Sequence, residues 1–156
     1  MTELAHVAAL IGVLGTAVVF GTDVFCAMVQ RPALALVDDG ALVAVMGYVH
    51  RYGDRRMPLP GVVGIIAAGA SAALAAAAGR WTTAIAAATA LALLLVWLML
   101  YLRVSAPINR QLTAAAQAHD VPANARALQA NWDRIINARA TLQSLAVCAL
   151  CVALMS

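Results

Sequence analysis

Long apolar stretches alternate with arginine-rich segments along this chain, and this alternation limits its fold more than any other feature. Nine of the ten basic residues lie in two segments, Arg31–Arg56 and Arg103–Arg139, and only Arg80 lies elsewhere. The apolar stretches are long enough to cross a bilayer, which takes about 20 residues per helix. Because short cytoplasmic loops accumulate arginine and lysine, both arginine-rich segments are predicted to lie inside. The Arg80 turn and both termini then lie outside.

The composition indicates a multi-pass protein of the cell membrane, in contact with the lipid bilayer. Of the 156 residues, 64% are hydrophobic and 11% are charged, whereas a soluble domain is about half apolar and about a quarter charged. The net charge of +3 comes from arginine alone, since the chain has no lysine. Positive-inside orientation and anionic lipid headgroups account for this excess, so we expect no nucleic-acid partner.

We predict one integral membrane domain, residues 1–156, folded as an all-α four-helix antiparallel bundle. The cytoplasmic segments should cover residues 30–58 and 103–134. Glu3 and the absence of a basic leader predict that the first span stays in the mature chain. The expected spans are Leu4–Val29, Leu59–Ala78, Thr82–Leu102 and Ile135–Met155.

The first cytoplasmic segment is predicted to contain an amphipathic helix at the membrane interface, between spans one and two. Gln30–Pro32 should end span one, and Asp38–Gly40 resembles a helix N-cap. The stretch that follows has apolar residues at helical spacing but is too short to cross a bilayer. Gly53–Pro58 is predicted to be a turn, with Pro58 or Pro60 in the first turn of span two.

The second cytoplasmic segment should hold a helix that starts near Pro107 and a break at Asp120–Pro122. From Asn124 the helical pattern continues without a stop signal to Ser156. The apolar end of this stretch is too short to cross a bilayer by itself. The crossing must therefore include the polar residues up to Arg139.

Two opposite charges are predicted at similar depth. Asp23 lies roughly 28 Å below the outer end of its span and Arg139 roughly 25 Å below the same end, at 1.5 Å per residue. We therefore expect them to lie within hydrogen-bonding reach. Two interpretations stay open: a buried ion pair that fixes helix register, or the floor of a polar pocket that opens at the cytoplasmic interface.

The pocket interpretation assigns chemical roles, since a carboxylate and an imidazole can exchange protons and an arginine can hold an oxyanion. The floor would consist of Asp23, Tyr101, Arg139 and Gln143, and the rim of His50, Asn109 and Asn137. The catalytic candidates are Asp23, His50 and Arg139, and the substrate-binding candidates are Tyr101, Asn109, Trp132, Asn137 and Gln143.

No cofactor, haem or metal ion is predicted. His6 belongs to the outer end of the bundle and His50 to the inner end, so they cannot share one haem or one ion, and His119 is expected to be solvated in a polar turn. Cys148 and Cys151 form a CxxC inside a span. We interpret them as small packing residues, because a quinone-coupled disulfide enzyme also needs a cysteine pair in an outer loop.

Several short motifs follow one another along essentially the whole chain. They are Gly21-Thr22-Asp23 with Arg31-Pro32, the stretch His50–Pro58, Pro107-Ile108-Asn109-Arg110, and Trp132-Asp133-Arg134 with Arg139 seven residues after Trp132. Together they resemble the bacterial membrane-protein family of unknown function that includes the anthrone oxygenases of polyketide pathways. Members of known activity oxidise a tricyclic anthrone to an anthraquinone with O₂, without a metal or a flavin.

The resemblance implies roles for Asn109, Trp132 and Arg139, which match the family's P-x-N and W…R positions. One position departs from the family: members often have histidine four residues after the tryptophan, where this chain has Ile136. A base must then come from elsewhere in the chain.

Two functions are weighed. The first is an oxidoreductase acting on a lipophilic aromatic substrate that enters from the cytoplasmic leaflet, with Asp23 or His50 as base and Arg139 with Asn109 holding an enolate oxygen. The second is a non-enzymatic accessory subunit or small-molecule binder, whose glycine- and alanine-lined helices pack against a partner membrane protein or a second copy. A catalytic pocket needs Asp23 and Arg139 individually, whereas a packing role tolerates exchange of the two charges.

Overall fold

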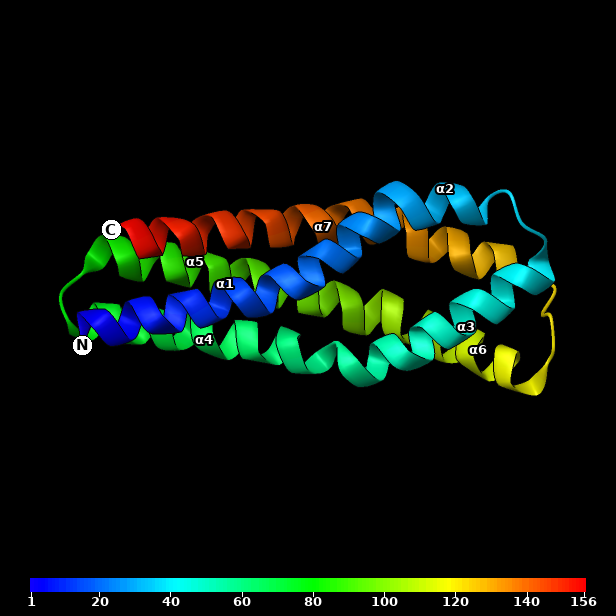
Figure 1. The fold of residues 1–156 in the computed structure, drawn as a ribbon, viewed down its shortest axis with the longest axis horizontal. Coiled ribbons are helices and arrows are strands. Elements are labelled where there is room, and N and C mark those ends of the chain that lie inside the picture. The colour runs from blue at the N-terminus through cyan, green and yellow to red at the C-terminus, as the bar shows by residue number, and fades with distance from the viewer.

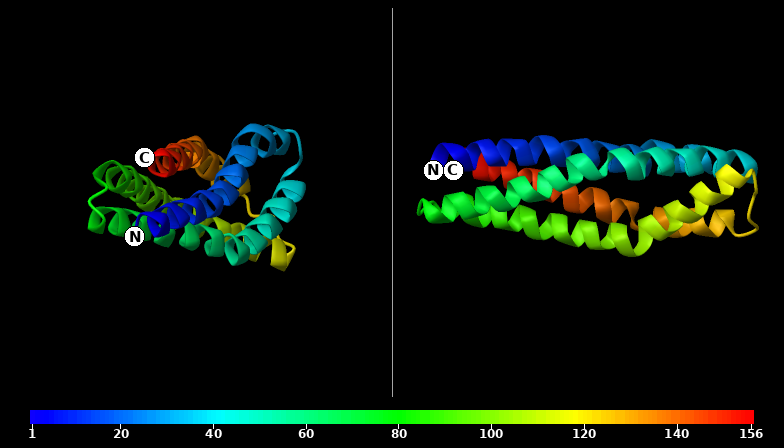
Figure 2. Two further views of the ribbon diagram at one scale, coloured as in Figure 1. Left: turned by 60° about the vertical axis from the view of Figure 1, so that its left-hand side comes forward. Right: turned by 90° about the horizontal axis from the view of Figure 1, so that it is seen from below.

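The computed structural model describes residues 1–156 and is an all-α bundle (Figure 1). Four stretches are helical, long and apolar enough to cross a membrane: Thr2–Leu34, Pro58–Ala77, Trp81–Ala118 and Ala125–Met155. Both termini lie at one end of the bundle (Figures 1 and 2). The longest stretch, of 38 residues, would measure about 57 Å at 1.5 Å per residue, well beyond a hydrocarbon core of about 30 Å.

Two of these stretches contain a π-helical turn. α1 (Thr2–Phe25) continues through the turn Cys26–Gln30 into α2 (Arg31–Leu34), and α5 (Trp81–Leu100) continues through Tyr101–Ser105 into α6 (Ala106–Ala118). In both cases a proline, Pro32 or Pro107, is the second residue after the turn.

A proline has no N–H and its ring crowds the carbonyl four residues earlier, and a π-helical turn relieves both problems. The prediction that Gln30–Pro32 ends the first helix is therefore wrong, because the helix continues to Leu34. The helix expected near Pro107 is likewise a continuation of α5.

α3 (Asp39–Arg56) and α4 (Pro58–Ala77) are separated by Met57 alone. Asp38 caps α3, since its Oδ1 accepts a hydrogen bond from the N–H of Ala41 at 2.7 Å, as the sequence predicted. The turn predicted at Gly53–Pro58 is wrong. The Met57 N–H bonds to the Gly53 carbonyl, and Pro58 lies in the first turn of α4, where no N–H donor is required.

α3 packs along α6 and extends the bundle at the end opposite to the termini (Figure 1). The two backbones meet at Gly47, where an added Cβ would lie 2.3 Å from the Ala116 Cβ and 2.5 Å from the Leu112 carbonyl oxygen. Only glycine permits this approach. α6 then ends at His119, which has a left-handed φ of 55°.

The break predicted at Asp120–Pro122 is confirmed, and so is the unbroken helix after it, α7 (Ala125–Met155).

α1 and α4 pack backbone to backbone near the middle of the bundle. An added Cβ on Gly15 would lie 2.8 Å from the Pro60 carbonyl oxygen and 2.9 Å from the Gly64 nitrogen. Small residues at such a contact let two apolar helices approach closely. On the far side of this contact from the termini, α1 and the continuous α3–α4 stretch diverge (Figure 1).

Candidate functional site

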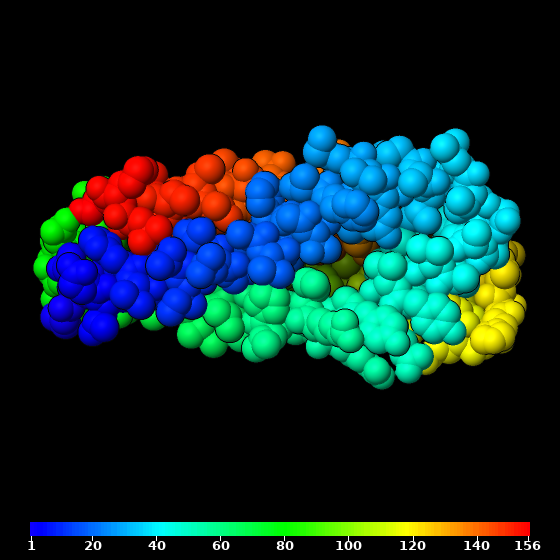
Figure 3. All heavy atoms as spheres, viewed as in Figure 1, coloured from blue at the N-terminus to red at the C-terminus, as the bar shows by residue number.

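A cavity of about 150 Å³ occupies the space between the diverging helices. It is hollowed into the side of the bundle between α1 and the α3–α4 stretch (Figure 3). Its apolar wall includes Val19, Val49, Val62, Ile65 and Leu98. Val49 and Val62 are about half exposed, so the mouth of the cavity is apolar as well.

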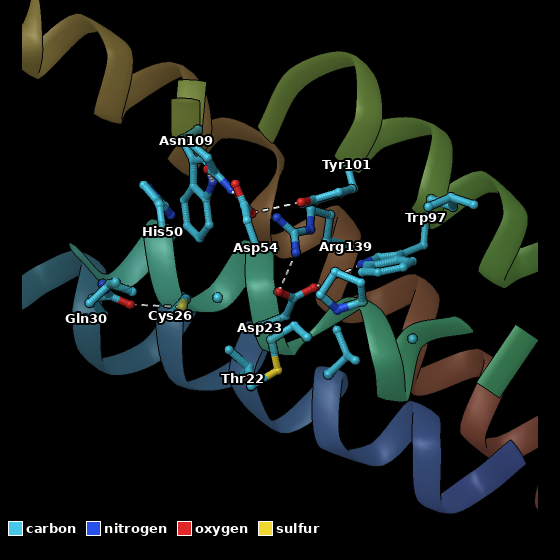
Figure 4. A pocket seen from close by; sticks show the side chains of 18 of the residues that line it. Thr22, Asp23, Cys26, Gln30, His50, Asp54, Trp97, Tyr101, Asn109 and Arg139 are labelled. Carbon is cyan, nitrogen blue, oxygen red and sulfur yellow. Dashed lines mark hydrogen bonds and ion pairs between the residues drawn. The ribbon is translucent and has the colours of Figure 1, made fainter. Parts of the chain in front are cut away.

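The expected contact between Asp23 and Arg139 is confirmed, and it lies against this cavity (Figure 4). Arg139 Nη2 donates to Asp23 Oδ1 at 2.7 Å, and both side chains are more than 90% buried. Arg139 Nη1 donates to the hydroxyl of Ser105 at 2.8 Å. α1, the π-helical turn after α5, and α7 are therefore joined through one guanidinium group.

Asp23 accepts three hydrogen bonds. Its Oδ2 accepts from Gln143 Nε2 at 2.7 Å and from Trp97 Nε1 at 3.1 Å, in addition to the Arg139 bond on Oδ1. Three donors at short range hold this carboxylate in one orientation. They also restrict the access of a ligand to its oxygens.

The Arg139 guanidinium also lies among three aromatic rings. Its carbon is 5.7 Å from the ring centroid of Trp97, 5.8 Å from that of Tyr101 and 5.5 Å from that of Trp132. These distances are within the range of cation–π attraction, which strengthens as water is excluded. The floor of the cavity thus consists of a buried ion pair with aromatic neighbours.

A second hydrogen-bond network links α3, the π-helical turn after α5, α6 and α7. Asp54 Oδ1 accepts from the Tyr101 hydroxyl at 2.8 Å and from Asn109 Nδ2 at 2.7 Å. Asn109 Oδ1 in turn accepts from Trp132 Nε1 at 3.0 Å. This network holds Tyr101 and Trp132 beside the cavity in fixed orientations.

His50 lines the same cavity one helical turn before Asp54 and is 4% exposed. Its ring centroid is 5.5 Å from that of Trp132, and its Nε2 has no hydrogen-bond partner. Burial lowers the pKa of His50 to about 4, against the opposing effect of the Asp54 carboxylate. The imidazole is therefore neutral at pH 7.

The structure brings together most of the residues that the sequence singled out. Asp23, Tyr101, Arg139, His50, Asn109 and Trp132 all line the cavity. Gln143 lies behind its floor, bonded to Asp23. Asn137 lies apart from them on the exposed face of α7, because two residues rotate a helix by about 200° and so place it opposite Arg139.

Sequence reasoning missed Asp54, Trp97 and Ser105. Asp54 had been placed in a turn, yet it follows His50 by four residues on one helix face, which was a detectable signal. Trp97 precedes Tyr101 by the same spacing. Nothing in the sequence distinguishes Ser105 from an ordinary small residue, since its contact with Arg139 joins segments 34 residues apart.

The structure contains no group of three or more His, Cys, Asp or Glu side chains that could hold a metal ion. Comparison with known protein families, curated proteins and solved structures finds no match to the chain. The fold and the cavity define a small protein with four candidate membrane helices and a laterally open cavity with a charged floor.

Proposed function

We propose that the chain is a multi-pass membrane protein that takes a lipophilic aromatic molecule from the bilayer into this cavity and oxidises it. One observation carries the proposal: the cavity opens on the side of the bundle through an apolar mouth and ends at the buried Arg139–Asp23 pair. A molecule dissolved in the bilayer can enter such a site without crossing water.

The orientation follows the arginine distribution. The end of the bundle formed by α3 and α6 carries most of the arginines and faces the cytoplasm in this proposal. α3 then lies at the cytoplasmic interface and the mouth of the cavity at the inner leaflet. Both termini lie outside.

The size of the cavity limits the ligand. An apolar cavity of about 150 Å³ accepts a molecule the size of benzene. One aromatic ring therefore fits inside, and the rest of a larger ligand lies in the mouth between Val49 and Val62. A tricyclic anthrone, the substrate class that the family resemblance implies, would bind with its outer rings in contact with lipid.

The proposed reaction starts with proton loss from the substrate to give an enolate. O₂ then oxidises the ring CH₂ to a carbonyl: one oxygen atom is retained and the other leaves as water with the two hydrogens. His50 suits the role of base, because it is neutral, lines the cavity and lacks a partner at Nε2. Asp23 suits it less, since its donors already occupy both oxygens.

Arg139 supports the enolate by its charge and has donors left for the enolate oxygen, because Nη1 and Nη2 each make one bond within the protein and Nε is buried without a partner. Asn109 donates one amide hydrogen to Asp54 and has a second for the enolate oxygen. In this arrangement Asp23 is a positioning residue that holds Arg139.

Binding and turnover are tested separately. Trp97 and Trp132 line the cavity, whereas Trp81 is the first residue of α5 and does not line it. Protein carrying Trp81→Phe therefore reports binding through quenching of tryptophan fluorescence. Anthrone should quench it saturably, and the purified protein should form anthraquinone faster than air does. His50→Gln should retain quenching and lose turnover.

The pH dependence adds a check on the base. With His50 in this role, kcat/KM should rise through about pH 4 and stay level from about pH 5 upwards. Wild-type turnover equal to the air background at every pH would remove the oxidation step from the proposal.

A binder without chemistry is the second candidate. It is favoured by the hydrogen bonds of Asp23 and Arg139, which are made within the protein and so suit a structural pair. Saturable quenching without turnover would select it. Packing against a partner helix has less support, because Gly15 and Gly64 already serve the contact between α1 and α4.

A further inference from the structure

A second groove, separate from the cavity mouth, runs between α3 and α6 and carries three guanidinium groups. Arg51 and Arg55 line it from α3 and Arg110 from α6, together with Thr113 and Gln117, around a volume of about 250 Å³. Its lining includes one carboxylate, that of Asp54.

The three positive charges of this groove have no ion-pair partner in the chain. The two salt bridges of the protein join Arg126 to Asp39 and Arg139 to Asp23. Asp54 is already bonded to Tyr101 and Asn109, and Arg51 Nε is buried without a hydrogen-bond partner. Like charges held close together repel one another unless an anion lies between them.

The fold holds these arginines in place. Arg51 and Arg55 lie four and eight residues after Gly47, where α3 and α6 are in backbone contact, so they project from the same face of α3. On α6, Thr113 follows Arg110 by three residues and Gln117 follows Thr113 by four. The three side chains therefore share the side of α6 that faces α3. The two helices that form the groove are thus held in a fixed arrangement by their contact at Gly47.

We infer that this groove binds a phosphate group. The planar guanidinium fork matches phosphate oxygens in pairs, and a cluster of arginines is typical of such sites. Arg55 precedes Pro58, the first residue of a candidate span, by three residues, which places the groove at the level of lipid headgroups. The phosphate is therefore the phosphodiester of an anionic lipid or a free phosphate from the cytoplasm.

Native mass spectrometry in detergent tests this inference with two probes, phosphatidylglycerol and inorganic phosphate as its competitor. Wild-type protein should bind phosphatidylglycerol saturably. Arg51→Gln, Arg55→Gln and Arg110→Gln should each weaken binding by about tenfold, since each removes a charge-assisted contact. If inorganic phosphate competes with the lipid, the site binds phosphate from either source. If it does not compete, the site binds the lipid.

The matched control is Arg134→Gln, which removes an exposed arginine from α7, outside the groove. It should leave the apparent Kd within about twofold of wild type, whereas non-specific charge attraction would respond to it equally. The inference is overturned if wild type binds neither probe, if Arg134→Gln weakens binding as much as Arg51→Gln, or if a triple variant of the groove arginines with wild-type thermal stability binds normally.

Discussion

At the residue scale, the buried charge of Arg139 is stabilised by contacts of its two terminal nitrogens and by neighbouring aromatic rings, while its Nε has no hydrogen-bond partner. It bonds to Asp23 and Ser105 and lies near the rings of Trp97, Tyr101 and Trp132. Buried ion pairs balance their desolvation only when such additional partners are present. The arrangement therefore makes each partner strongly dependent on the other.

This dependence predicts an unequal effect of single and double substitutions. Arg139→Met should lower the free energy of unfolding by about 3–5 kcal/mol, because it leaves the Asp23 carboxylate buried without a countercharge. Asp23→Asn in the same chain should recover part of this loss, since a neutral amide oxygen still accepts from Gln143 and Trp97. Thermal unfolding in detergent measures both.

The control for this comparison is Arg134→Met, an exposed arginine on the same helix, which should change stability by less than about 0.5 kcal/mol. Strictly additive losses from Arg139→Met and Asp23→Asn would contradict the coupling.

His50 makes the stability of the fold depend on pH. Burial lowers its pKa from the ordinary 6.5 to about 4, so between these values the unfolded chain binds more protons than the folded one. Stability should therefore fall as the pH drops from about 6.5 to about 4, by about 3 kcal/mol in total from this residue. The contribution of His50 to stability should be fully present above about pH 7.

Unfolding midpoints across this pH range measure the effect. His50→Gln should flatten that part of the profile, whereas His119→Asn should leave it unchanged, because asparagine tolerates the left-handed φ of His119. An identical slope in wild type and His50→Gln would show that other groups carry the pH dependence.

At the scale of elements, the π-helical turns and the glycine contacts decide which side chains reach the cavity. Of the side chains that line the cavity, Cys26 and Gln30 come from one π-helical turn and Tyr101 from the other. Such turns rotate the residues that follow relative to a regular α-helix, and they recur at functional sites. The close contact of α1 with α4 at Gly15 then sets where the two helices begin to separate.

Gly15→Ala should destabilise the bundle by about 1–3 kcal/mol, because the new methyl group would overlap the backbone of α4 at Pro60 and Gly64. Gly21→Ala on the same helix meets nothing within 4 Å and should be neutral or stabilising by up to about 1 kcal/mol, from helix propensity alone. Thermal unfolding compares the two. Equal effects would show that the contact between α1 and α4 is loose enough to admit a methyl group.

At the scale of the whole molecule, one end of the bundle differs from the other in charge and in shape. The end with both termini is narrow and rich in alanine, whereas α3, α6 and the start of α7 carry most of the arginines (Figure 1). An asymmetric distribution of this kind orients a polytopic protein in the membrane.

Single cysteines in a chain without Cys26, Cys148 and Cys151 test this orientation. A cysteine at Arg80 should react with a membrane-impermeant thiol reagent added to intact cells, and one at Gln111 should react only after the membrane is opened. Both positions are exposed, so a difference in labelling reports sidedness. Labelling of position 111 from outside intact cells would invert the proposed topology.

The sequence by itself determined the class of fold and much of the site. Apolar stretches of about 20 residues can satisfy their backbone hydrogen bonds in a bilayer only as helices. The distribution of arginines, which predicts the orientation, is also visible in the sequence. The depth of Asp23 and Arg139 followed from counting residues along regular helices, and so did their contact. Helical spacing also indicated which side chains share a face of α7, although Asn137 was assigned to the wrong face.

Tertiary structure alone decided where the helices separate and what lies in the gap. The roles of Ser105 and Asp54 depend on partners distant in sequence. Periodicity reports which face of a helix is apolar and carries no information about how far two helices stand apart. The distance between α1 and α4 is set by contacts such as Gly15 against Gly64. The cavity exists because this distance increases beyond these contacts.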